Sequence, residues 1–362
     1  MDNNLNIIIC GGGTGGHLFP AFAIADSFLL TNSNVEIRFI GSEKGIESNL
    51  YKKRTEKSYL LKSVGLNRSL SLKAIFHNSI IFPLNFLRSM LKTFKIFKEF
   101  KVDVVIGTGG YSSAIPLFVA YIKGIKFFIQ EQNSKPGLVN KIFINSATKV
   151  FFGVEPEENE NINYLVLGNP TKSINNNIKK ENKVSSENFT VFIIGGSQGS
   201  VPINNHFIKN YKKYLDLYPN IHMIWQCGEN NLESIRKQVQ SKRIELHGFI
   251  NDIENYYLKS NLIISRSGAL TLTEISNFKK PSILIPFPFA ANDHQMSNAK
   301  LFEKKGASKI VNQKELVAGI LEEEIDRLIK DKKKLKEMGK NASLISMPNA
   351  AQNIVEEILK HV

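Results

Sequence analysis

A glycine-rich turn that follows an apolar run constrains the fold of this chain most. Residues 10–17 read CGGGTGGH, directly after the apolar run 5–9 and directly before a helical pattern that begins near Phe19 or Pro20. The glycines let the backbone approach a ligand closely, and the helix that follows points its free N–H groups at that ligand. This order of strand, turn and helix predicts a parallel α/β domain with a ligand at the carboxyl end of its first strand.

The spacing of this turn argues against a redox cofactor. It departs from the dinucleotide pattern G-x-G-x-x-G, and Glu43 is the only acid in the region where a ribose-binding acid would follow. We therefore expect no cofactor. His17 ends the turn and is a titratable side chain at the sheet edge where chemistry is expected. A lone histidine is often structural, but this position favours a functional role.

Short apolar runs alternate with helical patterns in two series, which predicts two Rossmann-like domains. The first series of expected strands is 6–9, 36–40, 102–107, 126–130 and 149–152, and the second is 190–194, 222–227, 244–247, 262–265 and 282–286. A polar loop at 155–163 and a polar stretch at 172–188 separate the two series. We expect α/β domains over 1–168 and 169–345, facing each other across a cleft that holds the ligand.

Composition and net charge narrow the classes of protein to which this chain could belong. A chain of 362 residues that is 42% hydrophobic can bury a large core, and its net charge of +14 suits an anionic partner such as a nucleic acid or a membrane surface. Its two cysteines are far apart, which suits a reducing compartment. No leader peptide or membrane span is expected, because glycines interrupt the apolar stretches. We therefore expect a cytoplasmic protein.

A second glycine turn, GGSQGS at 195–200, follows the first expected strand of the second half. Its amides and the Ser197 hydroxyl offer a site for a pyrophosphate, although a tight turn that binds nothing has the same pattern. The chain has no Asp-x-Asp pair to hold a metal-bridged diphosphate, so no metal site is predicted.

Two further strings follow expected strands in the second half. SRSGALTLTE at 265–274 places Glu274 in the first turns of a helix, where a carboxylate either complements the helix dipole or binds ribose hydroxyls. The stretch 285–299 gathers polar residues that suit sugar hydroxyls or cap a helix. In the first half, GTGGYSS at 107–113 and QEQN at 130–133 put polar groups where an acceptor would bind.

Together these strings resemble the MurG family of bacterial glycosyltransferases over nearly the whole chain. The matching strings are GGGTGGH, GTGGYSS, EQN, GNP at 168–170, GGSQGS, SRSGALTLTE and DHQ with the following NA. The resemblance implies a GT-B fold and inverting, metal-independent transfer of N-acetylglucosamine from UDP-N-acetylglucosamine. The implied acceptor is the C4 hydroxyl of the muramyl sugar of undecaprenyl-pyrophosphoryl-N-acetylmuramyl-pentapeptide, so that lipid I becomes lipid II in cell-wall synthesis.

The resemblance also implies roles for particular residues. The expected donor-binding residues are Thr14, Gly15, Gly16, Asn133, Lys172, Ser197, Ile250, Ala269, Leu270, Thr271, Leu272, Thr273, Glu274 and Gln295. Within this set Ser197 would bind phosphate, the Ile250 backbone uracil and Glu274 ribose. Lys172 stands where the family usually has arginine, so it keeps the charge but lacks the planar fork.

Two residues are candidates for the general base that activates the acceptor. His17 is the first and Glu131 the second, and the sequence does not rank them. Tyr111 and Ser112 are expected on the acceptor side. The resemblance further implies that the first domain binds the acceptor and that a helix within 346–362 packs back on it.

A basic and apolar stretch at 66–101 fits an enzyme that acts on a lipid. We expect Ile75, Ile80, Leu84, Leu87, Lys73 and Arg88 to lie on the cytoplasmic face of the anionic inner membrane, with the protein peripheral to it. The alternative is an ordinary amphipathic helix, and Phe94, Phe97 and Phe100 suit a core-facing side.

Three other functions fit parts of the pattern. An epimerase of UDP-N-acetylglucosamine shares the two-domain plan but needs no lipid-facing surface. A nucleic-acid-binding protein would explain the charge, yet the one basic stripe is apolar enough for lipid. A nucleotide-sugar sensor would bind the donor without releasing UDP.

Overall fold

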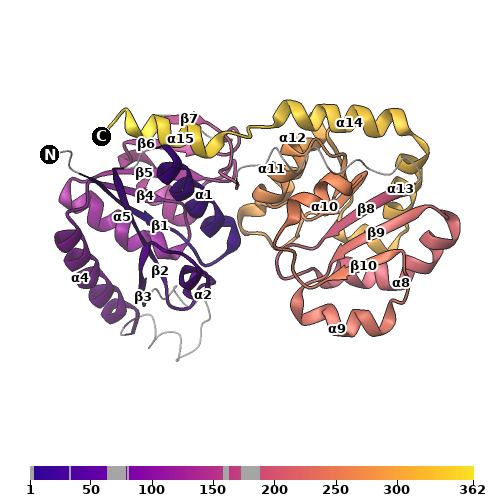
Figure 1. Ribbon diagram of the computed structural model, residues 1–362, viewed down its shortest axis with the longest axis horizontal. Coiled ribbons are helices and arrows are strands. Elements are labelled where there is room, and N and C mark those ends of the chain that lie inside the picture. The colour runs from indigo at the N-terminus through magenta and orange to yellow at the C-terminus, as the bar shows by residue number, and fades with distance from the viewer. Residues whose placement is uncertain (1–3, 32–33, 63–78, 80, 158–162, 173–187) are drawn as a thin grey trace. The chain divides into compact units, whose positions relative to one another are not determined.

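The computed structural model describes residues 4–31, 34–62, 79, 81–157, 163–172 and 188–362. The chain divides into two compact units. Unit 1 comprises Met1–Lys172 and Asn349–Val362, and unit 2 comprises Ser173–Pro348 (Figure 1).

Within the described residues, unit 1 has a seven-stranded parallel sheet in the order β3-β2-β1-β4-β5-β6-β7. Its strands are β1 (Leu5–Cys10), β2 (Val35–Ser42), β3 (Lys57–Leu61), β4 (Val104–Gly107), β5 (Lys126–Glu131), β6 (Lys149–Phe152) and β7 (Tyr164–Val166). Its helices are α1 (Gly15–Thr31), α2 (Glu47–Leu50), α4 (Phe82–Phe100), α5 (Tyr111–Lys123), α6 (Leu138–Phe143) and α15 (Ala350–Leu359), with short 3₁₀ turns at Tyr51–Lys53 and Ile144–Ser146.

Strand β1 lies inside this sheet, between β2 and β4, and is buried on both faces. Ile7 and Ile9 pack in the cluster that contains α1 and α15, whereas Ile8 packs in the cluster that contains α4 and α5. A continuous apolar run is the pattern of a strand covered by helices on both sides. The glycine turn at 10–17 therefore follows one of the best-buried strands of the unit.

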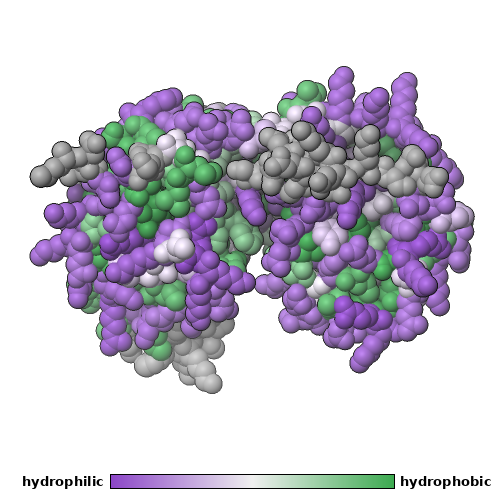
Figure 2. Space-filling view, viewed as in Figure 1, coloured by the Kyte–Doolittle hydropathy of each residue, from purple (hydrophilic) through white to green (hydrophobic). Residues whose placement is uncertain are grey.

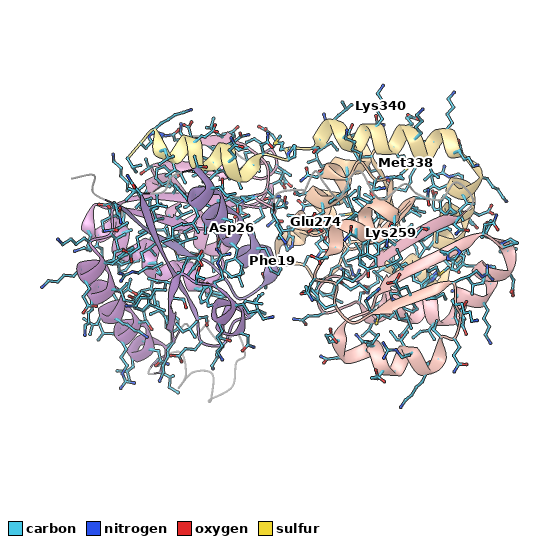
Figure 3. The ribbon with its side chains drawn as sticks, in the orientation of Figure 1. Phe19, Asp26, Lys259, Glu274, Met338 and Lys340 are labelled. Carbon is cyan, nitrogen blue, oxygen red and sulfur yellow. The ribbon has the colours of Figure 1, made fainter. Side chains whose placement is uncertain are left out.

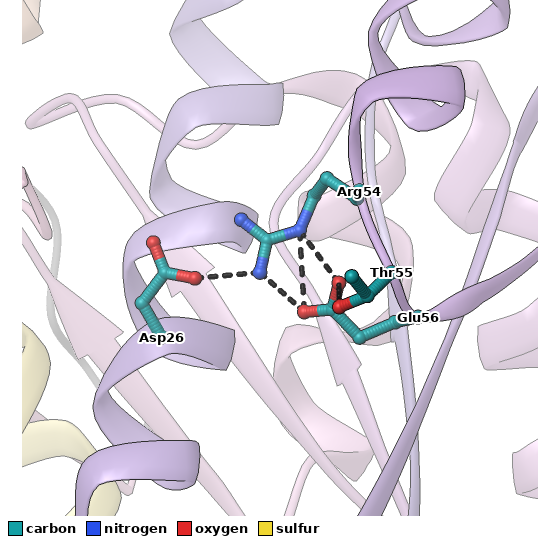
Figure 4. Close-up of polar contacts among 4 residues, drawn as sticks. All are labelled: Asp26, Arg54, Thr55 and Glu56. Atoms are coloured by element: carbon teal, nitrogen blue, oxygen red, sulfur yellow. Dashed lines mark hydrogen bonds and ion pairs between the residues drawn. The ribbon is translucent and has the colours of Figure 1, made fainter.

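An ion-pair network ties helix α1 to the segment that enters β3. The Arg54 guanidinium donates to Asp26 Oδ1 at 2.5 Å and also pairs with Glu56 (Figure 4). It lies 4.7 Å from the centre of the Phe22 ring. Its charge is thus shared between two acids and an aromatic face.

Unit 2 has a six-stranded parallel sheet within the described residues, in the order β10-β9-β8-β11-β12-β13. Its strands are β8 (Phe189–Ile194), β9 (Ile221–Gln226), β10 (Ile244–His247), β11 (Leu262–Ser265), β12 (Ser282–Leu284) and β13 (Ser308–Ile310). Its helices are α8 (Val201–Leu217), α9 (Glu229–Gln238), α10 (Ile253–Lys259), α11 (Ala269–Asn277), α12 (His294–Lys304), α13 (Ile320–Lys330) and α14 (Lys332–Ile345), with 3₁₀ turns at Ala291–Asp293 and Gln313–Val317.

The predicted α/β class and the ten predicted strands are confirmed, with two corrections. The structure adds β3, β7 and β13, which are short and lie at sheet edges. Helix α1 begins at Gly15 rather than near Phe19 or Pro20. The Thr14 carbonyl already accepts from the amides of His17 and Leu18, so His17 lies in the first turn of the helix.

The described residues contain no helix that is long and apolar enough to cross a bilayer. Hydrophilic side chains cover most of the face of each unit that is drawn in Figure 2.

Candidate active site

His17 is held so that one ring nitrogen is engaged and the other is not. Its Nδ1 atom lies 3.1 Å from the Thr108 carbonyl oxygen and 2.9 Å from Gln132 Oε1. Both partners are acceptors, so Nδ1 carries the hydrogen in the neutral ring and Nε2 carries the lone pair. Nε2 makes no hydrogen bond within the described residues. The geometry prepares this nitrogen to accept a proton.

The second glycine string of unit 1 makes room for this histidine. Gly109 and Gly110 have φ angles of +98° and +80°, which favour glycine. A Cβ atom on Gly109 would lie 2.8 Å from His17 Nδ1, and one on Gly110 would lie 2.3 Å from the Gly12 carbonyl oxygen. The two strings predicted to meet at this sheet edge are therefore in contact.

The buried carboxylate of Glu47 binds a backbone amide of the first glycine turn. Glu47 is fully buried, and it accepts from the amides of Gly13 at 2.9 Å and Ser42 at 2.8 Å. Cβ atoms on Gly12 and Gly45 would lie 2.4 and 2.0 Å from its side chain, so the glycines enclose it. This turn already contains an anionic group, which disfavours a phosphate at the same amides.

Glu131 organises the loop that follows β5. One carboxylate oxygen accepts from the Asn133 amide at 3.0 Å, and the other accepts from the Gly137 amide at 2.9 Å and from Asn140 Nδ2 at 2.8 Å. Glu131 is 1% exposed. Its lone pairs are thus used within its own loop.

The two residues predicted on the acceptor side differ in accessibility. Tyr111 begins α5 and is 50% exposed, whereas Ser112 is 3% exposed. Because Ser112 faces the interior, the prediction that it contacts an acceptor is not supported by its burial. Thr14 and Gly16 are exposed, Gly15 and Asn133 are half-buried, and Lys172 is exposed after the GNP string.

In unit 2, the turn at 195–200 presents unpaired amides before helix α8. Ser197 is exposed, and the Ser197 and Gln198 amides have no acceptor within the described residues. Ser200 is the N-cap residue of α8, but its side chain makes no capping hydrogen bond. An uncapped helix start next to open amides is a site for an anion.

A buried amide connects this turn to a second loop. Gln226, at the end of β9, donates to the Gly196 carbonyl oxygen at 3.0 Å and accepts from the Ile250 amide at 3.0 Å. Gln226 is 2% exposed. The backbone of Ile250 was predicted to contact uracil. Because its amide is already paired with Gln226, its carbonyl is the backbone group that remains for this contact.

Helix α11 contributes its N-terminus and one carboxylate. Ala269, Leu270 and Thr271 are half-buried in its first turn, while Leu272 is buried in the core. Glu274 lies on the same helix (Figure 3). It accepts from the Tyr257 hydroxyl at 2.9 Å. Burial raises the pKa of Glu274 to about 7. Small changes in its surroundings therefore decide whether Glu274 is ionised near neutral pH.

Gln295 holds the loop after β12. Its Oε1 accepts from the Phe287 amide at 3.0 Å, and its carbonyl accepts from Ser267 at 2.7 Å. Its amide nitrogen makes no hydrogen bond within the described part of the chain. That nitrogen is a free donor for a hydroxyl.

The comparisons with known proteins agree with this geometry. Models of the glycosyltransferase family 28 N-terminal and C-terminal domains match residues 7–152 and 190–356. A Myxococcus xanthus protein is 36% identical over 97% of this chain and 92% of its own length. It is named UDP-N-acetylglucosamine--N-acetylmuramyl-(pentapeptide) pyrophosphoryl-undecaprenol N-acetylglucosamine transferase. The chain belongs to the MurG family.

Solved structures support the same assignment. The MurG of Acinetobacter baumannii is 25% identical, covers 98% of this chain and 99% of its own, and superposes with a TM-score of 0.78. The predicted GT-B fold is confirmed. A putative UDP-N-acetylglucosamine 2-epimerase from Listeria monocytogenes is 12% identical over 99% of this chain and 96% of its own, with a TM-score of 0.66. That identity shows a shared fold alone.

Part of the predicted lipid-facing stretch of this MurG-family chain lies on α4. Leu84, Leu87 and Leu91 are 50%, 48% and 59% exposed, and Arg88 is exposed beside them. Phe97 and Phe100 are buried on the other side of the helix, as the alternative pattern predicts for them. Lys73, Ile75 and Ile80 lie outside the described residues.

Four residues at the MurG-family site were missed as contributors. They are Glu47, Gln226, Tyr257 and Arg266, all of which are buried. Each stands near the end of a strand or in a short helix. Arg266 lies within the string SRSGALTLTE but was given no role there, and the other three lie outside the matching strings. Their burial beside the glycine turns becomes visible only in three dimensions. The described residues hold no group of three or more His, Cys, Asp or Glu side chains placed to bind a metal.

Proposed function

We propose that this chain transfers N-acetylglucosamine from UDP-N-acetylglucosamine to the C4 hydroxyl of the muramyl sugar of undecaprenyl-pyrophosphoryl-N-acetylmuramyl-pentapeptide, with inversion at the anomeric carbon. The name of the Myxococcus xanthus relative gives the same donor and the same lipid-linked acceptor. The observation that carries the proposal for this chain is the engaged Nδ1 and open Nε2 of His17 beside a glycine turn.

Unit 2 supplies the donor site in this proposal. The open amides of the 195–200 turn and the start of α8 bind the diphosphate, which leaves with its charge on UDP. Glu274 accepts from the ribose hydroxyls, the Ile250 carbonyl contacts uracil, and the free Gln295 amide nitrogen donates to the sugar. Ala269, Leu270 and Thr271 contribute helix amides, and Leu272 and Thr273 support that helix.

Unit 1 supplies the base. Nε2 of His17 takes the proton of the C4 hydroxyl while that oxygen bonds to the anomeric carbon from the face opposite UDP. The bond between the anomeric carbon and the β-phosphate oxygen breaks, and its electron pair remains on UDP. General-base help of this kind is worth about 10²- to 10⁴-fold.

The other polar residues of unit 1 have supporting roles. Glu131 shapes the loop that carries Asn133, because its oxygens are bound within that loop. Thr14, Gly15 and Gly16 lie beside the donor sugar, and Tyr111 faces the acceptor. Lys172 contributes a charge to donor binding without a planar fork.

The exposed side of α4 is the proposed membrane contact. Three leucines with Arg88 among them combine apolar area with a cation, which suits an anionic bilayer surface such as the cytoplasmic face of the inner membrane. We propose a peripheral protein whose partners are the sugar nucleotide and the lipid-linked acceptor.

The deciding experiment follows UDP release by the purified full chain. UDP-N-acetylglucosamine is supplied with and without a short-chain lipid-linked muramyl-pentapeptide. We expect UDP release that depends on the acceptor, together with a disaccharide product. UDP release without acceptor, with a free sugar product, would instead identify a hydrolysing epimerase, and UDP-sugar binding without release would identify a sensor.

A further inference from the structure

Arg266 is a buried cation that no acidic side chain accompanies. Its side chain donates to the carbonyl oxygens of Ile285 and Pro286, each at 3.0 Å, to Ser200 Oγ at 2.8 Å and to Gln313 Oε1 at 2.6 Å. All four partners are neutral. The residue is 8% exposed, and no ion pair within the described residues includes it.

Such a charge is unusual in a protein interior. Buried ionised side chains are normally paired with an opposite charge, because removing an ion from water is costly. Burial lowers the pKa of Arg266 to about 10, and no acid raises it in return. The side chain is still charged near neutral pH, so unit 2 has a fixed positive charge without a partner anion.

The position of this charge indicates which anion it serves. Arg266 follows β11, and its backbone amide donates to the carbonyl of Ile194, the last residue before the 195–200 turn. Its guanidinium holds Ser200, the residue that starts α8. The Ser200 oxygen accepts from Arg266 and makes no capping hydrogen bond, so the start of the helix is uncapped. Arg266 therefore contacts both the residue before the turn and the last residue of the turn that carries the open amides.

The corresponding turn of unit 1 has the opposite charge behind it. There the buried Glu47 carboxylate accepts from the Gly13 amide. Two glycine turns that look alike in sequence thus differ in electrostatic character. A diphosphate is favoured at the turn backed by Arg266 and disfavoured at the turn backed by Glu47.

We propose that Arg266 is a positioning residue whose fixed charge makes the 195–200 turn selective for a nucleoside diphosphate and stabilises the diphosphate as it leaves. This proposal rests on the proposed function, because it assigns a residue to the donor site of that reaction. Arg266 acts through the turn and through its electric field, while the amides make the contacts with the phosphates.

The test compares the affinity of the full chain for UDP with its affinity for uridine, by calorimetry. The variants are R266Q, which removes the charge, and R266K, which keeps it with fewer donors. R236Q removes an exposed charge from α9 and serves as a matched control. A structural role alone would change both affinities together, whereas a role of the charge changes UDP binding selectively.

We expect R266Q to bind UDP about 10- to 50-fold more weakly while its uridine affinity changes by less than about twofold. R266K should keep the ratio of the two affinities within about threefold of the wild type, and R236Q should leave it unchanged. A proportional loss of both affinities in R266Q, or no loss, would overturn the proposal.

If R266Q does not fold, R266K decides the matter. An R266K variant with normal uridine affinity but more than tenfold weaker UDP binding would show that donor geometry, and not charge, is what matters. A wild-type chain that binds neither UDP nor UDP-N-acetylglucosamine would contradict the proposed function itself. A wild-type chain that binds UDP, with variants that bind it equally well, would contradict only the role of Arg266.

Discussion

Single side chains at the carboxyl edge of the unit 1 sheet differ in how much hydrogen-bonding capacity they have left. His17 has one ring nitrogen bound to acceptors and the other open, while both oxygens of Glu131 are bound within their own loop. A group can take a proton from a substrate only with a lone pair that is available to it. This difference ranks His17 above Glu131 as the base, which the sequence left undecided.

Replacing His17 with alanine should lower kcat by about 10²- to 10⁴-fold, because the base is lost while the donor site remains. The affinity for UDP should stay within about twofold, as measured by calorimetry. E131Q provides the contrast. A glutamine cannot accept from all of the loop donors, so this variant should lower the melting temperature. Near-normal turnover in H17A would remove His17 from the chemistry.

Glu274 should make nucleotide binding depend on pH. Its pKa is raised to about 7 by burial, and the ionised form is the stronger acceptor for the ribose hydroxyls of the proposed donor site. Affinity for UDP should fall about tenfold as the pH drops from 8 to 6, measured by calorimetry in one ionic strength. E274Q should bind more weakly at pH 8 and show a flatter profile. An unchanged slope in E274Q would assign the dependence to another group.

The raised pKa of Glu274 also makes the folding stability of unit 2 depend on pH, in the direction opposite to the affinity for UDP. Because the folded pKa is above the unfolded one, this carboxyl favours folding at pH values below the unfolded pKa. That contribution is lost as the pH rises through about 7. Unit 2 therefore loses some stability over the range in which its affinity for nucleotide increases.

Loops and helices of unit 2 are tied together at the carboxyl ends of its strands. Gln226 bonds the 195–200 turn with one end of its amide and the Ile250 loop with the other. One side chain thus fixes the spacing between the proposed phosphate-binding and uracil-binding segments. Such cross-links let short loops keep a defined geometry without secondary structure.

Q226E should weaken binding of UDP more than of inorganic pyrophosphate. A glutamate still accepts from the Ile250 amide but cannot donate to the Gly196 carbonyl, so the spacing of the two loops is lost. We expect about a tenfold loss for UDP, measured by competition against a fluorescent UDP analogue. Q238E, on the exposed part of α9, is the matched control. Equal losses for both ligands would argue against a role in spacing.

The exposed leucines of α4 should decide membrane binding. A variant with serine at Leu84, Leu87 and Leu91 should bind phosphatidylglycerol vesicles at least tenfold more weakly than the wild type in a sedimentation assay. L344S removes a leucine that is 76% exposed on α14 and is the control. Turnover of a water-soluble acceptor analogue should not change. Equal vesicle binding by the variant and wild type would refute the membrane contact.

The elements that sequence patterns predicted best are the fully buried ones. The run LNIIIC reads as a central strand because both faces are covered, and β1 is such a strand. The run KSYLL of β3 is only partly buried, and β7 has three residues, so neither has a clear period. The glycine-rich strings correctly indicated the carboxyl ends of strands at which the candidate site residues lie. Glu47 and Arg266 were given no role, although Arg266 lies within the string SRSGALTLTE, because the burial of a charged side chain and its partners depend on segments that are distant in the sequence.

On the scale of the whole molecule, unit 1 is built from two separate parts of the chain. Helix α15 packs on α1, and Ile354, Val355 and Ile358 are fully buried there with Phe28. Lys149 pairs with Glu357 at 3.0 Å and thereby connects β6 to this helix. The first and last segments of the chain thus share one core, while unit 2 has its own.

I358A should destabilise unit 1 by about 2–5 kcal/mol, because it leaves a cavity in that shared core. Native-state hydrogen exchange should show faster exchange of the β1 amides with little change in the β8 amides. I325A, at a site that is 1% exposed in the core of unit 2, should produce the reverse pattern. Equal effects on both strands in either variant would mean that the units unfold as one.

The return of α15 to unit 1 has a consequence for biosynthesis. A ribosome makes the strands of unit 1 first, then the whole of unit 2, and only afterwards the helix that covers Phe28 and β1. Until then the apolar side chains that α15 covers are exposed on the nascent unit 1, and exposed apolar surface of this kind promotes aggregation. Translation of unit 2 is therefore the interval during which the first half of this protein needs protection.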